Sequence, residues 1–151
     1  MKLVYMETIL LVERLHRRFL DVIKTELDRL HVEDINNVQT LILYNISNEQ
    51  LTVGELTNRG YYLGSNVSYN VKKLVENDYL VQEKSPHDKR STRVRLSDKG
   101  LALCNKIDEL HERHVKELSN GEPNEDALAD TNTCLHQLER FWTDYMNRVF
   151  R

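Results

Sequence analysis

A short stretch of the chain gathers positive charge in a protein that is otherwise acidic. The 151 residues carry a formal net charge of -3 at pH 7. Residues 84–100 read KSPHDKRSTRVRLSDKG and set six basic residues against two acidic ones. These charged residues are Lys84, Lys89, Arg90, Arg93, Arg95 and Lys99, with Asp88 and Asp98. Clustered lysine and arginine side chains neutralise phosphate groups, so the stretch is a candidate for contact with nucleic acid.

A histidine pair is the one pattern that suggests a metal ion. His111 and His114 belong to the sequence HERH, and this spacing places both on one face of a helix. Such a pair can ligate a metal, with Glu117 or Cys104 as a further ligand. The sequence shows no closed cluster of ligands around the pair, so a solvated or dimer-facing pair is favoured. We therefore predict no metal site and no cofactor.

The two cysteines, Cys104 and Cys134, are too few for the disulfide framework of a small secreted protein. Cys104 falls on an apolar helical stripe and Cys134 adjoins Leu135, where a cysteine is usually a small buried hydrophobe. Neither thiol has an obvious basic neighbour that would lower its pKa. Redox sensing is therefore the less favoured alternative.

Residues of the types used in catalysis form no known arrangement in this chain. The sequence has no glycine-rich phosphate-binding loop, and its serines, histidines and aspartates match no nucleophile motif. We therefore predict no catalytic residue and no enzymatic activity.

The composition favours a helical chain. Hydrophobic residues make up 40% and charged residues 30%, with five glycines and two prolines. A β-sandwich or barrel would need more turn residues at regular intervals. No apolar run has the length of a membrane span or a signal peptide, because charged residues interrupt the apolar start from Glu7 onward. We expect a cytoplasmic protein with no membrane association.

The spacing of apolar residues predicts helices over most of the chain and strands in one region. Gaps of three and four residues indicate amphipathic helices, whereas strict alternation in YLVQEK and TRVRLS indicates two antiparallel strands. We expect helices over 3–30, 36–46, 53–59, 65–77, 98–118 and 126–149, with strands at 51–52, 80–84 and 93–97.

Short polar residues predict where three of these helices begin. Asp34 and Asn36 are alternative caps for the second helix, and Ser65 and Ser97 are the predicted N-caps of two later ones. Their side-chain oxygens can accept hydrogen bonds from backbone N–H groups in the first helical turn.

Residues that tolerate a left-handed backbone predict where two helices end. Gly60 is expected to close the helix over 53–59 as a left-handed cap. Asn77 and Asp78 are expected to stop the helix that starts near residue 65, because Asn and Asp tolerate this conformation better than other non-glycine residues.

This order of elements predicts a fold that is mainly α with a small antiparallel β-wing, namely a winged helix-turn-helix with long N- and C-terminal helices. We expect residues 34–97 to form the DNA-binding unit, and residues 1–33 and 98–151 to form the helical dimerisation region of a single compact chain. The apolar stripes of the outer helices exceed what the central unit can bury, so we expect a homodimer.

Taken together, the helix that starts near residue 65 and the hairpin after it indicate DNA binding. Short hydroxyl and amide side chains suit base edges in a major groove, and Arg90 at the hairpin tip is placed to enter a minor groove. A solvated helix face or a basic loop that aids solubility would explain either signal alone, but their combination favours double-stranded DNA. The candidate DNA-binding residues are Ser65, Asn66, Ser68, Tyr69, Lys72, Lys73, Asp88, Lys89, Arg90 and Arg93.

The run DKRSTRVRLSDKG resembles the wing signature of the MarR family of winged-helix transcriptional regulators. The signature has Asp-x-Arg, an alternating strand, Leu followed by Thr or Ser, and a glycine shortly after. The matching residues are Asp88, Arg90, Ser91, Val94, Leu96, Ser97 and Gly100. The likeness in helix order covers nearly the whole chain, and LTVGELT with SNVSYNVKKLVENDYLV matches the two-helix unit of the family.

The resemblance implies specific roles. Arg90 would enter the minor groove, and Asp88 would orient it through a salt bridge. The residues implied to lie in the major groove are Ser65, Asn66, Ser68, Tyr69 and Lys72. The first helix and the last two would build a two-fold dimer on a pseudo-palindromic operator. The chain departs from the family at Asp78, where a glycine is usual, and at Tyr61 and Tyr62, where smaller or aliphatic residues are common.

The resemblance also implies a small aromatic or phenolic effector between the dimer helices and the DNA-reading unit. The candidate lining residues are His16, Phe19, Tyr44 and Tyr62, each of which can equally be plain core. Two alternatives remain open, a redox- or metal-responsive regulator of the same fold, and a winged-helix protein-interaction module without DNA binding. The second alternative predicts a neutral or acidic wing, unlike the wing of this chain.

Overall fold

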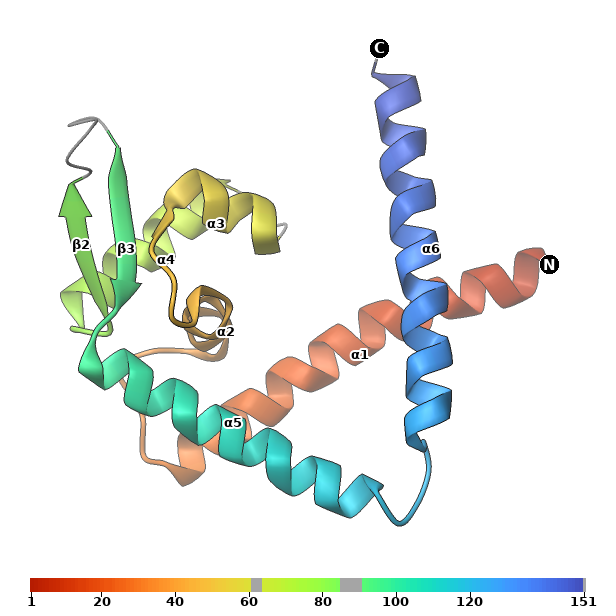
Figure 1. The fold of residues 1–151 in the computed structure, drawn as a ribbon, viewed down its shortest axis with the longest axis horizontal. Coiled ribbons are helices and arrows are strands. Elements are labelled where there is room, and N and C mark those ends of the chain that lie inside the picture. Colours follow the sequence, from red (N-terminus) through yellow and green to blue (C-terminus); the bar gives the residue numbers. More distant parts are fainter. Residues whose placement is uncertain (61–63, 85–90, 151) are drawn as a thin grey trace. The chain divides into compact units, whose positions relative to one another are not determined.

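The computed structural model describes residues 1–60, 64–84 and 91–150, and it is mainly helical with one small antiparallel sheet (Figure 1). The order of helices and strands is the expected one. In chain order the elements are α1 (Lys2–Arg29), α2 (Asn37–Ile46), β1 (Leu51–Thr52), α3 (Val53–Gly60), α4 (Gly64–Glu76), β2 (Leu80–Lys84), β3 (Thr92–Leu96), α5 (Asp98–Leu118) and α6 (Glu125–Val149).

The chain divides into two compact units, residues 1–108 and 109–151. The first unit contains α1 to α4, the sheet and the first half of α5. The second contains the rest of α5 and the whole of α6. The predicted DNA-contacting elements therefore all belong to the first unit.

The sheet has the strand order β1-β3-β2, and both pairings are antiparallel. Strands β2 and β3 pair from Leu80 opposite Leu96 to Lys84 opposite Thr92, and β3 leads directly into α5 (Figure 1). Val94 is fully buried in β3 while both of its neighbours are exposed, which confirms the alternation seen in the sequence.

The core of the first unit is apolar and draws on every helix from α1 to α5 as well as the sheet. Each of its large, fully buried side chains contributes about 1.5–3 kcal/mol to folding relative to an exposed position. The largest of these are Ile23, Ile42, Leu43, Ile46, Leu56, Val67, Leu74, Val94 and Ile107. This core holds α3, α4 and the sheet together as the helix-turn-helix and its wing.

Asn36 caps α2, which decides between the two residues that the sequence allowed. Its side chain accepts a hydrogen bond from the backbone N–H of Gln39 at 2.8 Å, and the Gln39 side chain accepts one from the Asn36 N–H at 3.0 Å. This reciprocal pair is a capping box. Asp34 is left free to serve a different contact, described below.

Two predictions about helix ends are wrong by one residue. Ser65 is not the N-cap of α4, because the helix begins at Gly64 and Ser65 belongs to its first turn. Gly60 is the last residue of α3 and not a residue beyond its end. Glycine adopts the helical conformation as well as the left-handed one, so each helix extends onto its glycine.

The end of α4 follows the prediction. Asp78 has φ of 65°, in the left-handed region. The N–H of Asp78 donates to the carbonyl of Val75 at 3.1 Å, and the N–H of Tyr79 donates to that of Leu74 at 2.9 Å. These two bonds form a Schellman motif, which satisfies the last carbonyls of the helix and turns the chain into β2.

Candidate DNA-binding surface

Helix α4 presents a polar face opposite its buried stripe. Val67, Val71 and Leu74 are buried, because they recur at the helical period and pack into the core. The candidates on the other face are exposed, namely Asn66, Ser68, Tyr69 and Lys72. Ser65 belongs to the same helix, but its side chain lies outside the described part. The helix therefore exposes amide, hydroxyl, phenol and ammonium groups that can meet base edges and phosphates.

The aromatic ring of Tyr69 is the most prominent of these groups, with 60% of the residue exposed. The Nζ atom of Lys73 lies 5.8 Å from the centroid of the ring, a weak cation–π contact. Lys73 also pairs with Glu76 at 3.4 Å, which compensates part of its charge. Lys72 is the more exposed residue of the two lysines.

Asn70 belongs to the core side of α4. Its Oδ1 accepts a hydrogen bond from Gln39 Nε2 at 3.1 Å, which ties α4 to α2. The half-buried Asn70 thereby satisfies the amide of the buried Gln39.

The wing strands place Arg93 and Arg95 on the exposed face of β3. Arg95 Nε donates to Glu83 Oε1 across the strand pair at 3.1 Å, and Gln50 Nε2 donates to the other oxygen of Glu83 at 3.1 Å. Arg95 is thus partly neutralised within the wing. Among the described residues of the wing, Arg93 is an exposed arginine that forms no ion pair.

The predicted tip of the wing lies outside the described residues. Asp88, Lys89 and Arg90 fall in the stretch 85–90, and so does the salt bridge expected between Asp88 and Arg90. These positions stay predictions that rest on the sequence.

Lys99 does not belong to the cationic surface of the wing. Its Nζ donates to Asp34 Oδ2 at 2.9 Å and to the carbonyl of Asn77 at 3.0 Å, and it lies 4.3 Å from the centroid of the Tyr79 ring. The Tyr79 hydroxyl donates to Asp34 Oδ1 at 2.7 Å. One of the six basic residues of the sequence cluster is therefore held at the base of the sheet.

The ionisation of Asp34 reflects these contacts. Its partial burial alone would raise the pKa of the carboxyl, but the hydrogen bonds from Lys99 and Tyr79 and the charge of Lys99 outweigh burial and hold that pKa below its usual value. Burial, followed by the bond to Asp34, raises the pKa of Tyr79 well above its usual value. At neutral pH the Asp34 carboxyl is thus ionised and the Tyr79 phenol is protonated, the forms in which the phenol donates to the carboxylate.

No sequence signal predicted this group of polar contacts. Asp34, Tyr79 and Lys99 are far apart in the chain, and each is an ordinary surface residue type. The nearest clue is Gly100, because a glycine at a fixed place beside a helix start suggests close approach of another backbone.

Of the effector candidates, Tyr44 has the most defined surroundings. Its hydroxyl donates to Asp108 Oδ1, and this bond, together with burial, raises the pKa of Tyr44 to about 12. Both residues line a small open pocket between the end of α2 and the first half of α5. Its described lining is Tyr44, Ser47, Asn48, Leu96, Leu101, Cys104, Asn105 and Asp108.

The other effector candidates are not gathered at this pocket. His16 and Phe19 are exposed on α1 and do not belong to its described lining, and Tyr62 lies outside the described residues. Of the three candidates that the structure describes, only Tyr44 therefore lines this pocket.

The thiols and histidines show no redox or metal arrangement in the described part of the chain. Burial, and then the charge of Asp108, raises the pKa of Cys104 to about 11, which opposes the thiolate needed for oxidant sensing. Cys134 is exposed on α6. No three His, Cys, Asp or Glu side chains of the described residues are gathered as metal ligands, and no described helix is long and apolar enough to span a membrane.

Comparisons with known proteins agree with this architecture. A family model described as a winged helix DNA-binding domain matches residues 35–100. The exopolysaccharide II synthesis transcriptional activator ExpG of Rhizobium meliloti (strain 1021) is 41% identical over 138 residues, which cover 91% of this chain and 71% of ExpG.

Two solved structures show the same fold at lower identity. Streptococcus pneumoniae FabT in complex with DNA has a TM-score of 0.75 and 18% identity, over 93% of this chain and 99% of FabT. Staphylococcus aureus MarR in complex with salicylate and kanamycin has a TM-score of 0.76 and 22% identity, over 94% of each chain. The described helices and sheet thus have a known counterpart along nearly their whole length.

Proposed function

Because the chain belongs to the winged-helix DNA-binding transcriptional regulators and has the fold of Staphylococcus aureus MarR, we propose that it is a MarR-family regulator that binds a pseudo-palindromic operator as a homodimer. The family and the fold are those of transcription regulators and not of enzymes. The observation that carries the proposal is the polar face of α4, which lies opposite a buried stripe and precedes a wing with an exposed arginine. FabT, with the same fold, has been seen in complex with DNA.

In this proposal α4 enters the major groove of each half-site. Asn66, Ser68 and Tyr69 contact base edges, because an amide can pair with adenine and an aromatic ring can contact a thymine methyl group. Ser65 and the lysines of the helix, Lys72 and Lys73, bind phosphates or bases nearby. These side chains are assigned from their exposure and chemistry and from the family resemblance.

The wing supplies the minor-groove contact. Arg90 enters the narrow groove, where the potential is most negative, and Asp88 orients its guanidinium. Lys89 and Arg93 contact the flanking phosphates, and the exposed position of Arg93 on β3 supports its role. The roles of Asp88, Lys89 and Arg90 are supported by the match of residues 88–100 to the wing signature of the family, because the wing tip is assigned from the sequence.

The homodimer is supported by apolar surface on both outer helices. Residues 34–97 are the proposed reading unit, and residues 1–33 and 98–151 the proposed dimerisation region. No residue of α6 is buried in the described chain, and the N-terminal half of α1 exposes several large apolar side chains. Exposed apolar stripes of this length on two helices fit a surface that a second copy covers.

A small aromatic or phenolic effector is proposed at the pocket beside Tyr44. The pocket sets the apolar side chains of Leu96 and Leu101 beside hydroxyl, amide and carboxylate groups that can orient a small ligand. Salicylate, a phenolic acid, is bound in the structure of Staphylococcus aureus MarR. Binding of salicylate, measured by calorimetry on wild-type protein and on Tyr44→Phe, tests this part.

ExpG is named as a transcriptional activator, so activation is the mode of regulation that its similarity supports for this chain. A reporter gene placed behind the bound operator should show higher transcription when this chain is expressed. Lower transcription would indicate a repressor and would leave the DNA-binding proposal intact.

The central test is a DNA-binding measurement on Arg90→Ala. Selection of operators from a random duplex pool by the wild-type protein provides the ligand. We expect the variant to bind the selected operator more weakly, by about 1–3 kcal/mol if Arg90 reads bases, and the dependence on salt to flatten by about one unit of slope.

Lys24→Ala is the matched control. It removes the same unit of charge from an exposed position on α1, a helix with no candidate DNA contact, and it should leave affinity nearly unchanged. Normal binding by Arg90→Ala at physiological salt would refute the wing assignment. If wild-type protein enriches no duplex at all, the chain is a protein-interaction module instead.

A further inference from the structure

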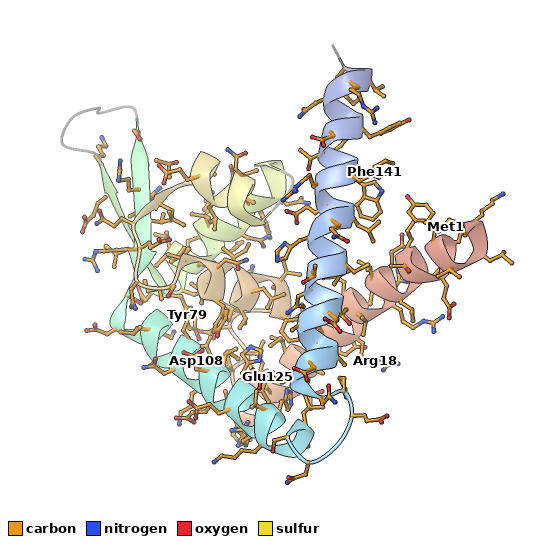
Figure 2. The ribbon with its side chains drawn as sticks, turned by 45° about the vertical axis from the view of Figure 1, so that its right-hand side comes forward. Met1, Arg18, Tyr79, Asp108, Glu125 and Phe141 are labelled. Carbon is orange, nitrogen blue, oxygen red and sulfur yellow. The ribbon has the colours of Figure 1, made fainter. Side chains whose placement is uncertain are left out.

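The polar contacts around Lys99 join three separate parts of the first unit at one point. We call the group of Asp34, Asn77, Tyr79, Lys99 and Gly100 the α4–α5 corner. Asp34 comes from the connection between α1 and α2, Asn77 and Tyr79 from the short connection between α4 and β2, and the last two residues from the first turn of α5. Figure 2 labels Tyr79 near the base of the sheet, where α5 starts.

Lys99 is the hub of this corner. Its ammonium has three hydrogen atoms, and it donates to Asp34 Oδ2 at 2.9 Å and to the Asn77 carbonyl at 3.0 Å while lying over the Tyr79 ring. Asn77 Nδ2 donates in turn to the Asp34 carbonyl at 3.3 Å. Each partner of Lys99 therefore also contacts another member of the corner.

Hydrogen bonds of Ser97 also attach the start of α5 to the same corner. The N–H of Ser97 donates to the Tyr79 carbonyl at 3.1 Å, and Ser97 Oγ donates to the Asp78 carbonyl at 2.5 Å. Ser97 Oγ also accepts from the N–H of Gly100 at 3.1 Å, so the cap of α5 is bonded directly to the left-handed end of α4. The first turn of α5 is thus fixed to the last turn of α4.

We propose that Asp34 and Lys99 are positioning residues for operator binding, because they fix the direction in which α5 leaves the end of the recognition helix α4. The proposal rests on the proposed homodimer. In that dimer α5 belongs to the dimerisation region, so its direction relative to α4 sets the separation of the two recognition helices. That separation has to match half-sites one helical turn apart.

Ion pairs at exposed positions contribute little to folding, and the side chains of Lys99 and Asp34 are 49% and 39% exposed. Loss of this pair should therefore leave the chain folded while loosening the angle between α4 and α5. The chief consequence is then a broader range of half-site spacings that the protein accepts, and not a loss of structure.

The variant Asp34→Asn distinguishes a positioning role of Asp34 from a purely electrostatic effect on DNA binding. Removal of a negative charge should strengthen binding to DNA on electrostatic grounds alone. If Asp34 positions the reading helix, the same substitution weakens binding. The sign of the change in affinity therefore decides between the two explanations.

The experiment uses the full chain and operators selected by wild-type protein from random duplexes of about 30 base pairs, long enough for two half-sites. Affinity is measured for the selected operator, for the same duplex with one half-site scrambled, and for duplexes with one or two base pairs inserted between half-sites. The variants are Asp34→Asn, Lys99→Met and Tyr79→Phe, with Lys24→Met as the matched control.

We expect Asp34→Asn and Lys99→Met to lose roughly two- to thirty-fold in affinity for the selected operator, the range found for residues that couple sites without touching the ligand. Binding to the single half-site should change far less, and the penalty for inserted base pairs should shrink. The salt dependence of Lys99→Met should match that of wild type, since no phosphate contact is lost.

Equal or tighter binding of the selected operator by Asp34→Asn would overturn the proposal, as would equal losses on the operator and on the half-site. If Asp34→Asn fails to fold, as judged by circular dichroism, Tyr79→Phe decides the matter, because it removes only the hydroxyl that donates to Asp34. A wild-type protein that selects no duplex refutes the proposed function itself, which is a different result.

Discussion

Position 100 requires a glycine because the backbone of Tyr79, which is distant in sequence, passes close to it. A β-carbon added at this position would lie 2.3 Å from the carbonyl oxygen of Tyr79, a distance that real β-carbons essentially never show. The clash would be with backbone, which cannot rotate away as a side chain can. The glycine of the wing signature therefore permits α5 to start directly against the chain that leaves α4.

Gly100→Ala should lower the free energy of unfolding by about 1–3 kcal/mol or more, because the corner has to open to admit the methyl group. Chemical denaturation monitored by circular dichroism measures the change. Gly121→Ala is the control, since nothing lies within 4 Å of its added β-carbon and the change should be neutral or slightly stabilising. Equal effects of the two substitutions would contradict the close approach at Gly100.

Cys104 should be unreactive in the folded protein. With a pKa of about 11, only about one thiol in a thousand is ionised at pH 8, and the side chain is buried. Iodoacetamide at pH 8, followed by mass spectrometry, should modify Cys134 first and Cys104 only after unfolding. Cys134→Ser is the control and should remove the fast reaction. Rapid modification of Cys104 would restore the redox-sensing alternative.

The left-handed residue just after α4 is an aspartate, Asp78, where a glycine would fit with less backbone strain. Asp78 has a left-handed φ of 65°, and its side chain makes no hydrogen bond or ion pair with the residues that the structure describes. The family resemblance also places a glycine at this position. The Schellman motif is thus maintained by backbone bonds and core packing, against the conformational preference of residue 78.

Asp78→Gly should raise the free energy of unfolding by about 0.5–1 kcal/mol, because glycine adopts the left-handed conformation without the penalty of a β-carbon. Asp78→Ala is the matched comparison. It removes the same carboxylate but keeps the β-carbon, so it should lower stability by a similar amount. Thermal and chemical unfolding of the three proteins gives both changes. If both variants shift stability in the same direction, the carboxylate and not the backbone governs this site.

The outer helices expose more apolar surface than a monomer in water would retain. Leu15 on α1 is 64% exposed and Phe141 on α6 is 53% exposed, and both belong to apolar stripes at helical spacing. The two helices lie in different units of the chain. The dimer proposal is therefore independent of the assignments made for the wing and for α4.

Leu15→Glu and Phe141→Glu should each weaken self-association on the order of 30-fold or more, because a carboxylate would be buried in an apolar interface. Analytical ultracentrifugation over a range of concentrations measures this. Asp130→Asn, a change at an exposed polar position on α6, is the control and should leave the dimer intact. Glutamate variants that remain dimeric would place the interface elsewhere.

The sequence by itself determined the order of elements, the winged helix-turn-helix class and the buried and exposed faces of α4 and β3. These properties follow from the periods of 3.6 and 2 residues, which are local and therefore visible in one dimension. Helix ends at Gly60 and Ser65 were missed by one residue, since glycine is compatible with both sides of a helix boundary.

Only the tertiary structure decided which charged and polar side chains are bonded to other residues of the protein and which remain exposed. Lys99 and Arg95 belong to the cationic stretch in the sequence, yet one is held by Asp34 and the other pairs with Glu83. Asn70 likewise turns to Gln39. These partners lie 12 to 65 positions apart; pairing of β2 with β3 brings Arg95 to Glu83, and packing of the core brings the other two pairs together. Such contacts have no periodic signature, because their proximity is a consequence of the whole fold and not of any one segment.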